Sequence, residues 1–156
     1  MTPDMKKILI LLLLVVSPMK AEIYDISQLD LKRHQGKVVY LDFWASWCKP
    51  CQKSFPWMNL LLTRHPAQKF TVTTVNLDAE TETMHQFMGK VNADFDVYHD
   101  PGGQMAEQLD VEGLPTSYLI DPSGNVANKH VGFYARYIDK YEREIEALLT
   151  KSASAE

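Results

Sequence analysis

The stretch VVYLDFWASWCKPCQKSFP, residues 38–56, decides the fold and points to the chemistry of this chain. Val38 to Phe43 form an apolar run typical of a buried strand, and after an aromatic turn the pattern indicates a helix that begins at Cys48 and Cys51. These are the only cysteines among 156 residues. Two thiols three residues apart at a helix start can close a disulfide within one turn and open it again. The stretch therefore predicts a thiol–disulfide oxidoreductase.

Cys48 is the expected nucleophile. Only a thiolate attacks a disulfide, and an ordinary cysteine with a pKa of about 8.5 is mostly protonated at neutral pH. Cys48 would face the unpaired N–H groups and the positive dipole end of the helix, and Lys49 adds a nearby positive charge. If these lower the thiol pKa to roughly 7, about half of the thiol is ionised at neutral pH. Cys51, one turn deeper, would be the resolving thiol, and Pro50 would stiffen the first turn.

The motif DFWASWCKPC, residues 42–51, resembles the active site of the thioredoxin superfamily, in particular of extracytoplasmic reductases of the TlpA/ResA kind. The resemblance implies an α/β domain with the thioredoxin fold, a central mixed β-sheet flanked by helices. It assigns the nucleophile to Cys48 and the resolving thiol to Cys51. It also implies that a buried acid at Asp42 helps to move protons to and from Cys51, and that Pro115 is a cis proline facing the disulfide.

The chain departs from this subfamily in three places. Such proteins often carry glutamate three residues after the second cysteine, where this chain has Ser54, and many have asparagine in place of Asp42. Proton handling should therefore be closer to that of thioredoxin, and burial would raise the pKa of Asp42. The loop before Pro115 also lacks the Gly-Ala-Pro pattern common in cytochrome c maturation reductases, which weakens an assignment to haem-protein maturation.

The segments that follow fit the same fold. The β-branched residues 70–77 (FTVTTVNL) predict a second central strand, and Asp78 is expected to cap the next helix. Residues 94–113 predict a short strand, a turn and a helix to about Val111. A minimal thioredoxin lacks such an inserted strand–helix unit before its cis proline. By the resemblance, the insertion selects the extracytoplasmic subfamily.

Residues 113–116 (GLPT) resemble the cis-proline loop, and a strand, a tight turn, an antiparallel strand and a final amphipathic helix are predicted after it. Following the resemblance, the backbone of Leu114 would pair with an extended substrate segment by strand addition. Trp47, Pro50 and Pro115 would form an apolar rim around the disulfide.

The N-terminal residues 1–21 have the layout of a secretory signal peptide, with two lysines, the apolar run 8–16 and small or polar residues ending in Ala21. Nine apolar residues are too few for the ~20 that a helix needs to cross a bilayer. We therefore expect cleavage after Ala21 and one periplasmic thioredoxin-like domain, residues 22–156. That domain has 13 basic and 19 acidic residues, a net charge of −6, which argues against nucleic-acid binding.

We expect this domain to be a monomer that reduces disulfides in exported proteins, with apocytochromes c as one possible substrate class. By the resemblance, Lys49 and Pro50 between the cysteines lack the histidine of strongly oxidising relatives, which favours a reductant. A membrane thiol–disulfide electron donor would then have to recharge it. We expect no cofactor and no metal. The sequence leaves the substrate and the donor open.

Four alternatives use the same two cysteines. A purely structural disulfide would constrain the unfolded chain little, because its loop is short. A zinc site with Cys48, Cys51 and two of the five histidines would need a convergence that the spacing does not indicate. A peroxiredoxin-like peroxidase usually has a Thr-x-x-Cys motif without a partner cysteine three residues on. A non-catalytic binding module on the same scaffold would tolerate the loss of either thiol.

Overall fold

The computed structural model describes residues 21–153, so the predicted signal peptide lies outside the described residues apart from Ala21. The strands of the described part are β1 (Ile23–Asp25), β2 (Val38–Trp44), β3 (Phe70–Asn76), β4 (Asp96–His99), β5 (Thr116–Ile120) and β6 (Val126–Val131). The α-helices are α1 (Lys49–Arg64), α2 (Thr81–Met88), α3 (Gln104–Gln108) and α4 (Ile138–Ala153). Short 3-10 turns are η1 (Ile26–Gln28), η2 (Leu31–His34) and η3 (Ala135–Tyr137). Within residues 21–153, no helix has both the length and the apolar character needed to cross a membrane.

The strands form one mixed sheet in the order β1-β4-β3-β2-β5-β6. The first four strands of that order are parallel, whereas β5 is antiparallel to β2 and β6 is antiparallel to β5. β2 lies in the middle and pairs with β3 along its whole length, from Val38 opposite Phe70 to Trp44 opposite Asn76. The predicted thioredoxin fold, a central mixed sheet flanked by helices, is confirmed.

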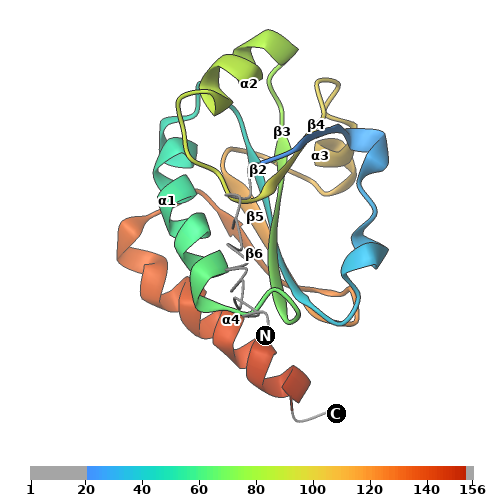
Figure 1. The fold of residues 1–156 in the computed structure, drawn as a ribbon, viewed down its shortest axis with the longest axis vertical. Helices are drawn as coiled ribbons and strands as arrows, with labels where there is room; N and C mark the ends of the chain where they lie inside the picture. The colour runs from blue at the N-terminus through green and yellow to red at the C-terminus, as the bar shows by residue number, and fades with distance from the viewer. Residues whose placement is uncertain (1–20, 154–156) are drawn as a thin grey trace, which may run out of the picture.

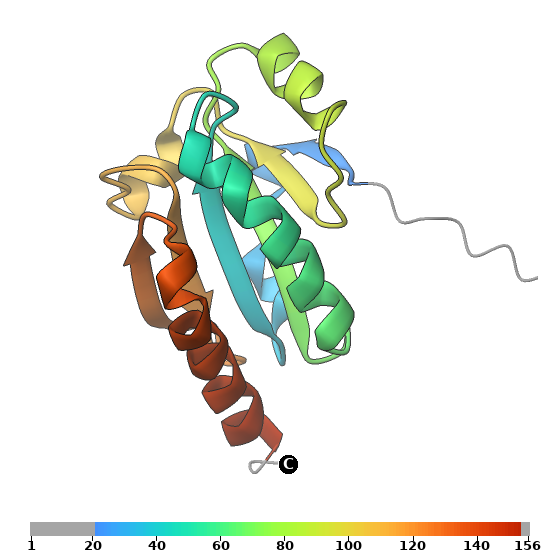
Figure 2. The ribbon, with the colours of Figure 1, turned by 90° about the vertical axis from the view of Figure 1, so that its left-hand side faces the viewer.

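The alternation of side chains along β2 divides the core into two layers. Val39, Leu41 and Phe43 pack with residues of α3 and of the 3-10 turns after β1. Tyr40 and Trp44 pack on the opposite face with the buried sides of α1 and α4. Figures 1 and 2 show α1 and α4 next to one another over this second face, with α3 on the other side of the sheet. Cys48 and Cys51 belong to the cluster on the α1 and α4 side of the sheet.

α1 follows the sequence prediction closely. Cys48 is its N-cap residue and Pro50 lies in its first turn, where a missing N–H group leaves no hydrogen bond unmade. The helix ends at Arg64, shortly before Pro66. Its buried face carries an apolar stripe at helical spacing: Phe55, Met58 and Leu61.

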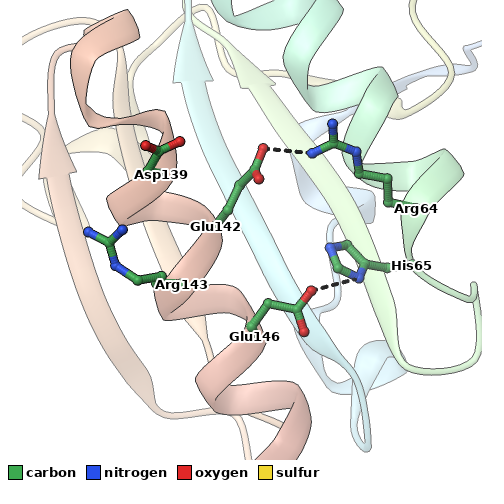
Figure 3. A pocket seen from close by; sticks show the side chains of 6 residues that line it. All are labelled: Arg64, His65, Asp139, Glu142, Arg143 and Glu146. Atoms are coloured by element: carbon green, nitrogen blue, oxygen red, sulfur yellow. Dashed lines mark hydrogen bonds and ion pairs between the residues drawn. The ribbon is translucent and has the colours of Figure 1, made fainter.

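At its C-terminal end, α1 contacts α4 through charged side chains. Six residues line a groove there: Arg64, His65, Asp139, Glu142, Arg143 and Glu146 (Figure 3). Arg64 Nη1 donates to Glu142 Oε1 at 2.9 Å, and His65 Nδ1 lies 3.9 Å from Glu146 Oε1. The 16 residues of α1 span about 24 Å. The charged groove is thus remote from the two cysteines at the other end of the helix.

β4 and α3 form the strand–helix unit predicted before the proline loop. β4 pairs in parallel with both β1 and β3, so the inserted strand is a full member of the sheet. α3 ends at Gln108, earlier than the expected end near Val111. Asp110 adopts a left-handed backbone with a φ of 53°, which interrupts the helix before Val111.

Candidate active site

Cys48 and Cys51 form a disulfide at the start of α1, with their Cα atoms 5.3 Å apart. The two cysteines differ in access: Cys48 keeps 4% of its surface exposed, whereas Cys51 has none. An attacking sulfur can therefore reach the bond only from the side of Cys48. A division between a nucleophile at Cys48 and a resolving thiol at Cys51 requires such an asymmetry, and that division stays a prediction.

The start of α1 favours negative charge on the Cys48 sulfur. The backbone N–H of Cys51 donates to Cys48 Sγ at 3.3 Å, so one unpaired donor of the helix already points at this atom. The first turn contains no acidic residue, and the exposed Lys49 adds a positive charge. Groups of this kind favour a negative sulfur at a helix start, so the predicted thiolate at Cys48 has suitable surroundings in the structure.

Asp78 fixes the turn that leads into the cysteines. Its buried carboxylate accepts hydrogen bonds from the backbone N–H and the hydroxyl of Ser46, at 3.0 to 3.1 Å, and from Asn76 Nδ2 at 2.9 Å. Gln52 of α1 donates to the carbonyl of Ser46 at 2.8 Å and closes the turn from the other side. Trp47, the tip of this turn, is 68% exposed. Asp78 thus positions both the tryptophan and the nucleophile.

The prediction that Asp78 caps the next helix was wrong. α2 begins at Thr81, and its N-cap is Glu80, whose side chain makes no capping hydrogen bond. One signal could have indicated that Asp78 lies beside the turn before Cys48. β2 and β3 are parallel strands of equal length, and their pairing brings Trp44 opposite Asn76 at one edge of the sheet. The residues that follow the two strands then meet there.

Asp42 lies in the middle of β2, on the face covered by α1, because it alternates in step with Tyr40 and Trp44. It is 1% exposed, and its Oδ2 atom has no hydrogen-bond partner. Burial raises the pKa of the Asp42 carboxyl well above its ordinary value, as expected from the sequence. Cys48 and Cys51 belong to the same buried cluster on this face of the sheet. The Asp42 carboxyl, a group that can bind a proton, therefore lies on the same face of the sheet as the disulfide.

The proline loop lies beside the end of β6. The Leu114–Pro115 peptide bond is cis, and the carbonyl of Pro115 accepts a hydrogen bond from the N–H of Gly132 at 2.7 Å. Leu114 is half-buried and packs against the core cluster that contains both cysteines. Across residues 21–153 its N–H and C=O find no hydrogen-bond partner. The loop thus leaves the N–H and the C=O of Leu114 available, next to the core cluster that contains both cysteines.

The four predicted substrate-contact residues differ in exposure. Trp47 and Pro50, on either side of Cys48 in the sequence, are exposed, Leu114 is half-buried, and Pro115 is buried. The exposed part of the predicted rim is therefore formed by Trp47 and Pro50. Among residues 21–153, no three His, Cys, Asp or Glu side chains come together in a way that could hold a metal ion.

Comparison with known sequences places this site in a family. The sequence model of the AhpC/TSA family matches residues 16–129. Proteins named thiol-disulfide oxidoreductase ResA are similar to this chain. The one from Bacillus thuringiensis is 32% identical over 120 residues, which cover 76% of this chain and 69% of the relative. The one from Bacillus subtilis is 34% identical over 106 residues, which cover 68% and 59%.

Solved structures point the same way. A protein described as a thiol:disulfide interchange protein DsbE from Chlorobium tepidum is 47% identical, with a TM-score of 0.75 over 78% of this chain and 86% of that one. An exposed lipoprotein thioredoxin from Streptococcus pneumoniae is 28% identical, with a TM-score of 0.62 over 76% and 90%. The fold of this chain thus occurs in proteins described as a thiol:disulfide interchange protein and as a thioredoxin.

Proposed function

This chain belongs to the AhpC/TSA family and is a thiol-disulfide oxidoreductase of the ResA and DsbE-like kind, and from that premise we propose that it reduces disulfides in exported proteins. The observation that carries the proposal is the unequal access to the two sulfurs, 4% for Cys48 and none for Cys51. A protein substrate can form a bond with the Cys48 sulfur. The buried Cys51 sulfur can then attack Cys48 and displace the substrate.

The reaction begins with the reduced pair. The Cys48 thiolate attacks one sulfur of a substrate disulfide, so a mixed disulfide forms and the other substrate sulfur leaves. Cys51 gives its proton to Asp42 and attacks the Cys48 sulfur. The Cys48–Cys51 bond forms, the bond to the substrate breaks, and the second substrate sulfur leaves as a thiolate. Two electrons have passed from the enzyme to the substrate.

Asp42 suits the role of proton acceptor because of its burial. A raised pKa brings the carboxyl closer to the pKa range of a thiol, and proton transfer is efficient when the two groups are matched. Its position on the α1 face of β2, in the layer that contains Cys51, supports this role.

Substrate docking follows from the surface around Cys48. The backbone N–H and C=O of Leu114 can pair with an extended segment of the substrate, and Trp47 offers an exposed aromatic face beside the nucleophile. A Trp47→Ala variant should raise KM for a protein disulfide about tenfold and leave reduction of hydroxyethyl disulfide unchanged, because the small compound needs no docking surface. Equal loss on both substrates would contradict this role.

The direction and the location of the reaction are further parts of the proposal. The absence of histidine between the cysteines supports a reductant. For this two-electron couple, a change of ~30 mV in the reduction potential corresponds to about 1.4 kcal/mol, so modest electrostatic changes near the cysteines affect the direction of the reaction. The layout of residues 1–21 supports export, and the similar protein of Streptococcus pneumoniae is an exposed lipoprotein. A reductant in that compartment depends on a membrane thiol–disulfide electron donor.

The substrates are tested by trapping. Cys51→Ser removes the resolving thiol, so mixed disulfides at Cys48 should accumulate in cells and can be identified by mass spectrometry. Apocytochromes c among the trapped proteins would place the protein in haem-protein maturation, and a broad set of exported proteins would indicate general repair. Absence of any trapped exported protein, with the variant folded and present outside the cytoplasm, would overturn the proposal.

Two other functions have decisive tests. A peroxiredoxin-like peroxidase would consume hydrogen peroxide at the expense of its thiols, and we expect no such turnover because Cys51 pairs with Cys48 only three residues away. A non-catalytic binding module would keep its full biological activity in a Cys48→Ala variant. We expect that variant to be inactive.

A further inference from the structure

Two buried side-chain atoms in the described part of the chain have no hydrogen-bond partner: Asp42 Oδ2 and His130 Nδ1. Roughly 90% of buried polar groups are paired, so each exception needs an explanation. The two residues lie on β2 and β6, the strands on either side of β5. Ser117 of β5 is opposite Asp42 in one pairing and opposite His130 in the other. The three side chains therefore form one row on the same face of the sheet.

Glu144 of α4 determines which nitrogen of His130 is free. His130 Nε2 lies 2.6 Å from Glu144 Oε2, and the side chain of His130 is only 9% exposed. A carboxylate accepts a hydrogen bond, so Nε2 carries the proton of the neutral ring. His130 Nδ1 is then an unprotonated, buried acceptor held in place by the carboxylate.

Asp42 supplies the complementary group. Burial raises the pKa of its carboxyl, so the protonated form, a hydrogen-bond donor, persists over a wider pH range. The Tyr40 hydroxyl donates to Ser117 Oγ at 2.9 Å, which places two hydroxyl groups along the row. The negative charge of Asp42 is also one cause of the raised pKa of Tyr40, after burial. An unpaired donor and an unpaired acceptor thus lie in one row, with the Ser117 hydroxyl, which accepts from Tyr40, between them.

We propose that His130 accepts the proton that Asp42 must release between turnovers, across the Ser117 and Tyr40 hydroxyls, and passes it to solvent beside α4. The inference rests on the proposed role of Asp42. When Cys51 has given its proton to Asp42 and the enzyme disulfide has closed, the carboxyl still holds that proton. The proton moves to His130 Nδ1, the imidazolium is stabilised by Glu144, and water then takes the proton. No electron moves in this step.

The other titratable and charged groups that face the row come from three elements. They are Tyr40 of β2, Cys48 and Cys51 of α1, and Tyr141 and Glu144 of α4, with Lys140 3.8 Å from Glu144 at the surface. The pair of His130 and Glu144 connects the row to the surface, because the carboxylate of Glu144 belongs to a side chain that is 20% exposed.

Rapid mixing of the reduced protein with Ellman's reagent separates the two sulfur reactions. The bimolecular release of chromophore reports attack by Cys48, and the following unimolecular release reports attack by Cys51. Asp42 must be ionised before it can take the proton of Cys51, and a positively charged His130 favours that ionised form. In His130→Gln the pH profile of the second phase should therefore move up by about one unit, the effect of losing one positive charge ~10 Å from Asp42, and the phase should slow about tenfold at neutral pH. The first phase should not change. His65→Gln, which alters the His–Glu pair between the C-terminal end of α1 and Glu146 of α4, should match the wild type in both phases.

Further variants decide between causes. The double variant His130→Gln/Glu144→Gln should keep the upward shift, whereas a return to the wild-type profile would mean that unpaired Glu144 alone caused it and would overturn the inference. A second-phase profile of His130→Gln that superimposes on the wild type would also overturn it. If His130→Gln does not fold, Ser117→Ala is the replacement test. It should move the pH profile of the second phase in the same direction by a smaller amount, and an unchanged profile would overturn the inference.

Asp42→Asn separates this inference from the proposed function. If Asp42→Asn changes the second phase and His130→Gln does not, the proton route fails and the role of Asp42 stands. If Asp42→Asn leaves the second phase unchanged, the role of Asp42 fails and the proton route fails with it.

Discussion

The two ends of α1 use the same kinds of side chain for different purposes. At the N-terminal end, Asp78 is buried and fully engaged, and Asp42 is buried with an unpaired oxygen. At the C-terminal end, Glu142 pairs with the half-exposed Arg64, and Glu146 is exposed to solvent (Figure 3). Both ends bring carboxylates against α1, yet only the first removes them from water.

This difference in burial determines what each carboxylate can do. A solvent-exposed ion pair contributes about 0 to 1 kcal/mol, because water and salt screen it. A buried carboxylate either needs its hydrogen bonds, as Asp78 does, or changes its proton affinity, as Asp42 does. We therefore expect changes at the cysteine end to alter chemistry or stability strongly, and matched changes at the far end to have small effects.

The largest effect is expected at the nucleophile. Cys48→Ser should lower the rate of protein disulfide reduction by at least about a thousandfold, because the reacting sulfur is lost and Cys51 is sealed from solvent. The measurement is turnover of insulin disulfides by the purified protein. Circular dichroism that matches the wild type would show that the fold is kept. Residual activity within tenfold of the wild type would show that the two thiols are equivalent.

The next effect is the pH dependence that Asp42 adds to stability. Because the folded pKa lies above the unfolded value of about 3.9, the native state is favoured at low pH and loses stability as pH rises through this window. Relative to Asp42→Asn, the wild type should lose about 1.4 kcal/mol of unfolding free energy per pH unit between the two pKa values. Urea unfolding of both proteins across this range measures the difference, and parallel curves would contradict the assignment.

The third effect concerns the turn before Cys48. Asp78→Ala leaves the buried Asn76 amide and the N–H of Ser46 without their acceptor, so unfolding free energy should fall by about 2 to 4 kcal/mol. The turnover rate should fall as well, because the turn positions both Trp47 and Cys48. Urea unfolding and the kcat/KM for a protein disulfide measure the two effects. A loss of unfolding free energy below about 0.5 kcal/mol would mean that Asp78 contributes no more to stability than a surface carboxylate, and would contradict this prediction.

The smallest effect is expected at the far end of α1. Arg64→Ala removes one exposed ion pair, while Glu142 keeps its hydrogen bond from Trp57 Nε1 at 3.1 Å. Stability should fall by less than about 1 kcal/mol, and disulfide reduction should not change. The same two assays apply. A loss of activity at this distance would mean that the two ends of the helix are coupled.

The redox pair and the elements around it could be predicted from local patterns, whereas the thioredoxin fold was expected through the resemblance of residues 42–51. The apolar run before Cys48, the spacing to Cys51 and the β-branched run at 70–77 each lie within one element. The cis proline was expected only through the resemblance, and the structure confirms a cis bond before Pro115. Asp42 could be placed in a buried strand from its neighbours alone.

The groups that surround the site could not be found in this way, because they come together only through the register of the sheet and the packing of α4. Asp78 reads locally as a helix cap, and its contact with Ser46 requires that β2 and β3 end together. His130 and Glu144 are 14 residues apart, on a strand and a helix. No periodic pattern in the sequence joins either pair.

The proposed mechanism of disulfide reduction depends most on the unequal access to the two sulfurs. Competitive alkylation measures this inequality directly. The reduced protein is treated with a limiting amount of iodoacetamide near neutral pH, and each cysteine-containing site is quantified by mass spectrometry. Cys48 should be modified at least about tenfold faster than Cys51, because it is the accessible thiol and lies at the N-terminus of α1. Equal rates, or faster modification of Cys51, would contradict the account.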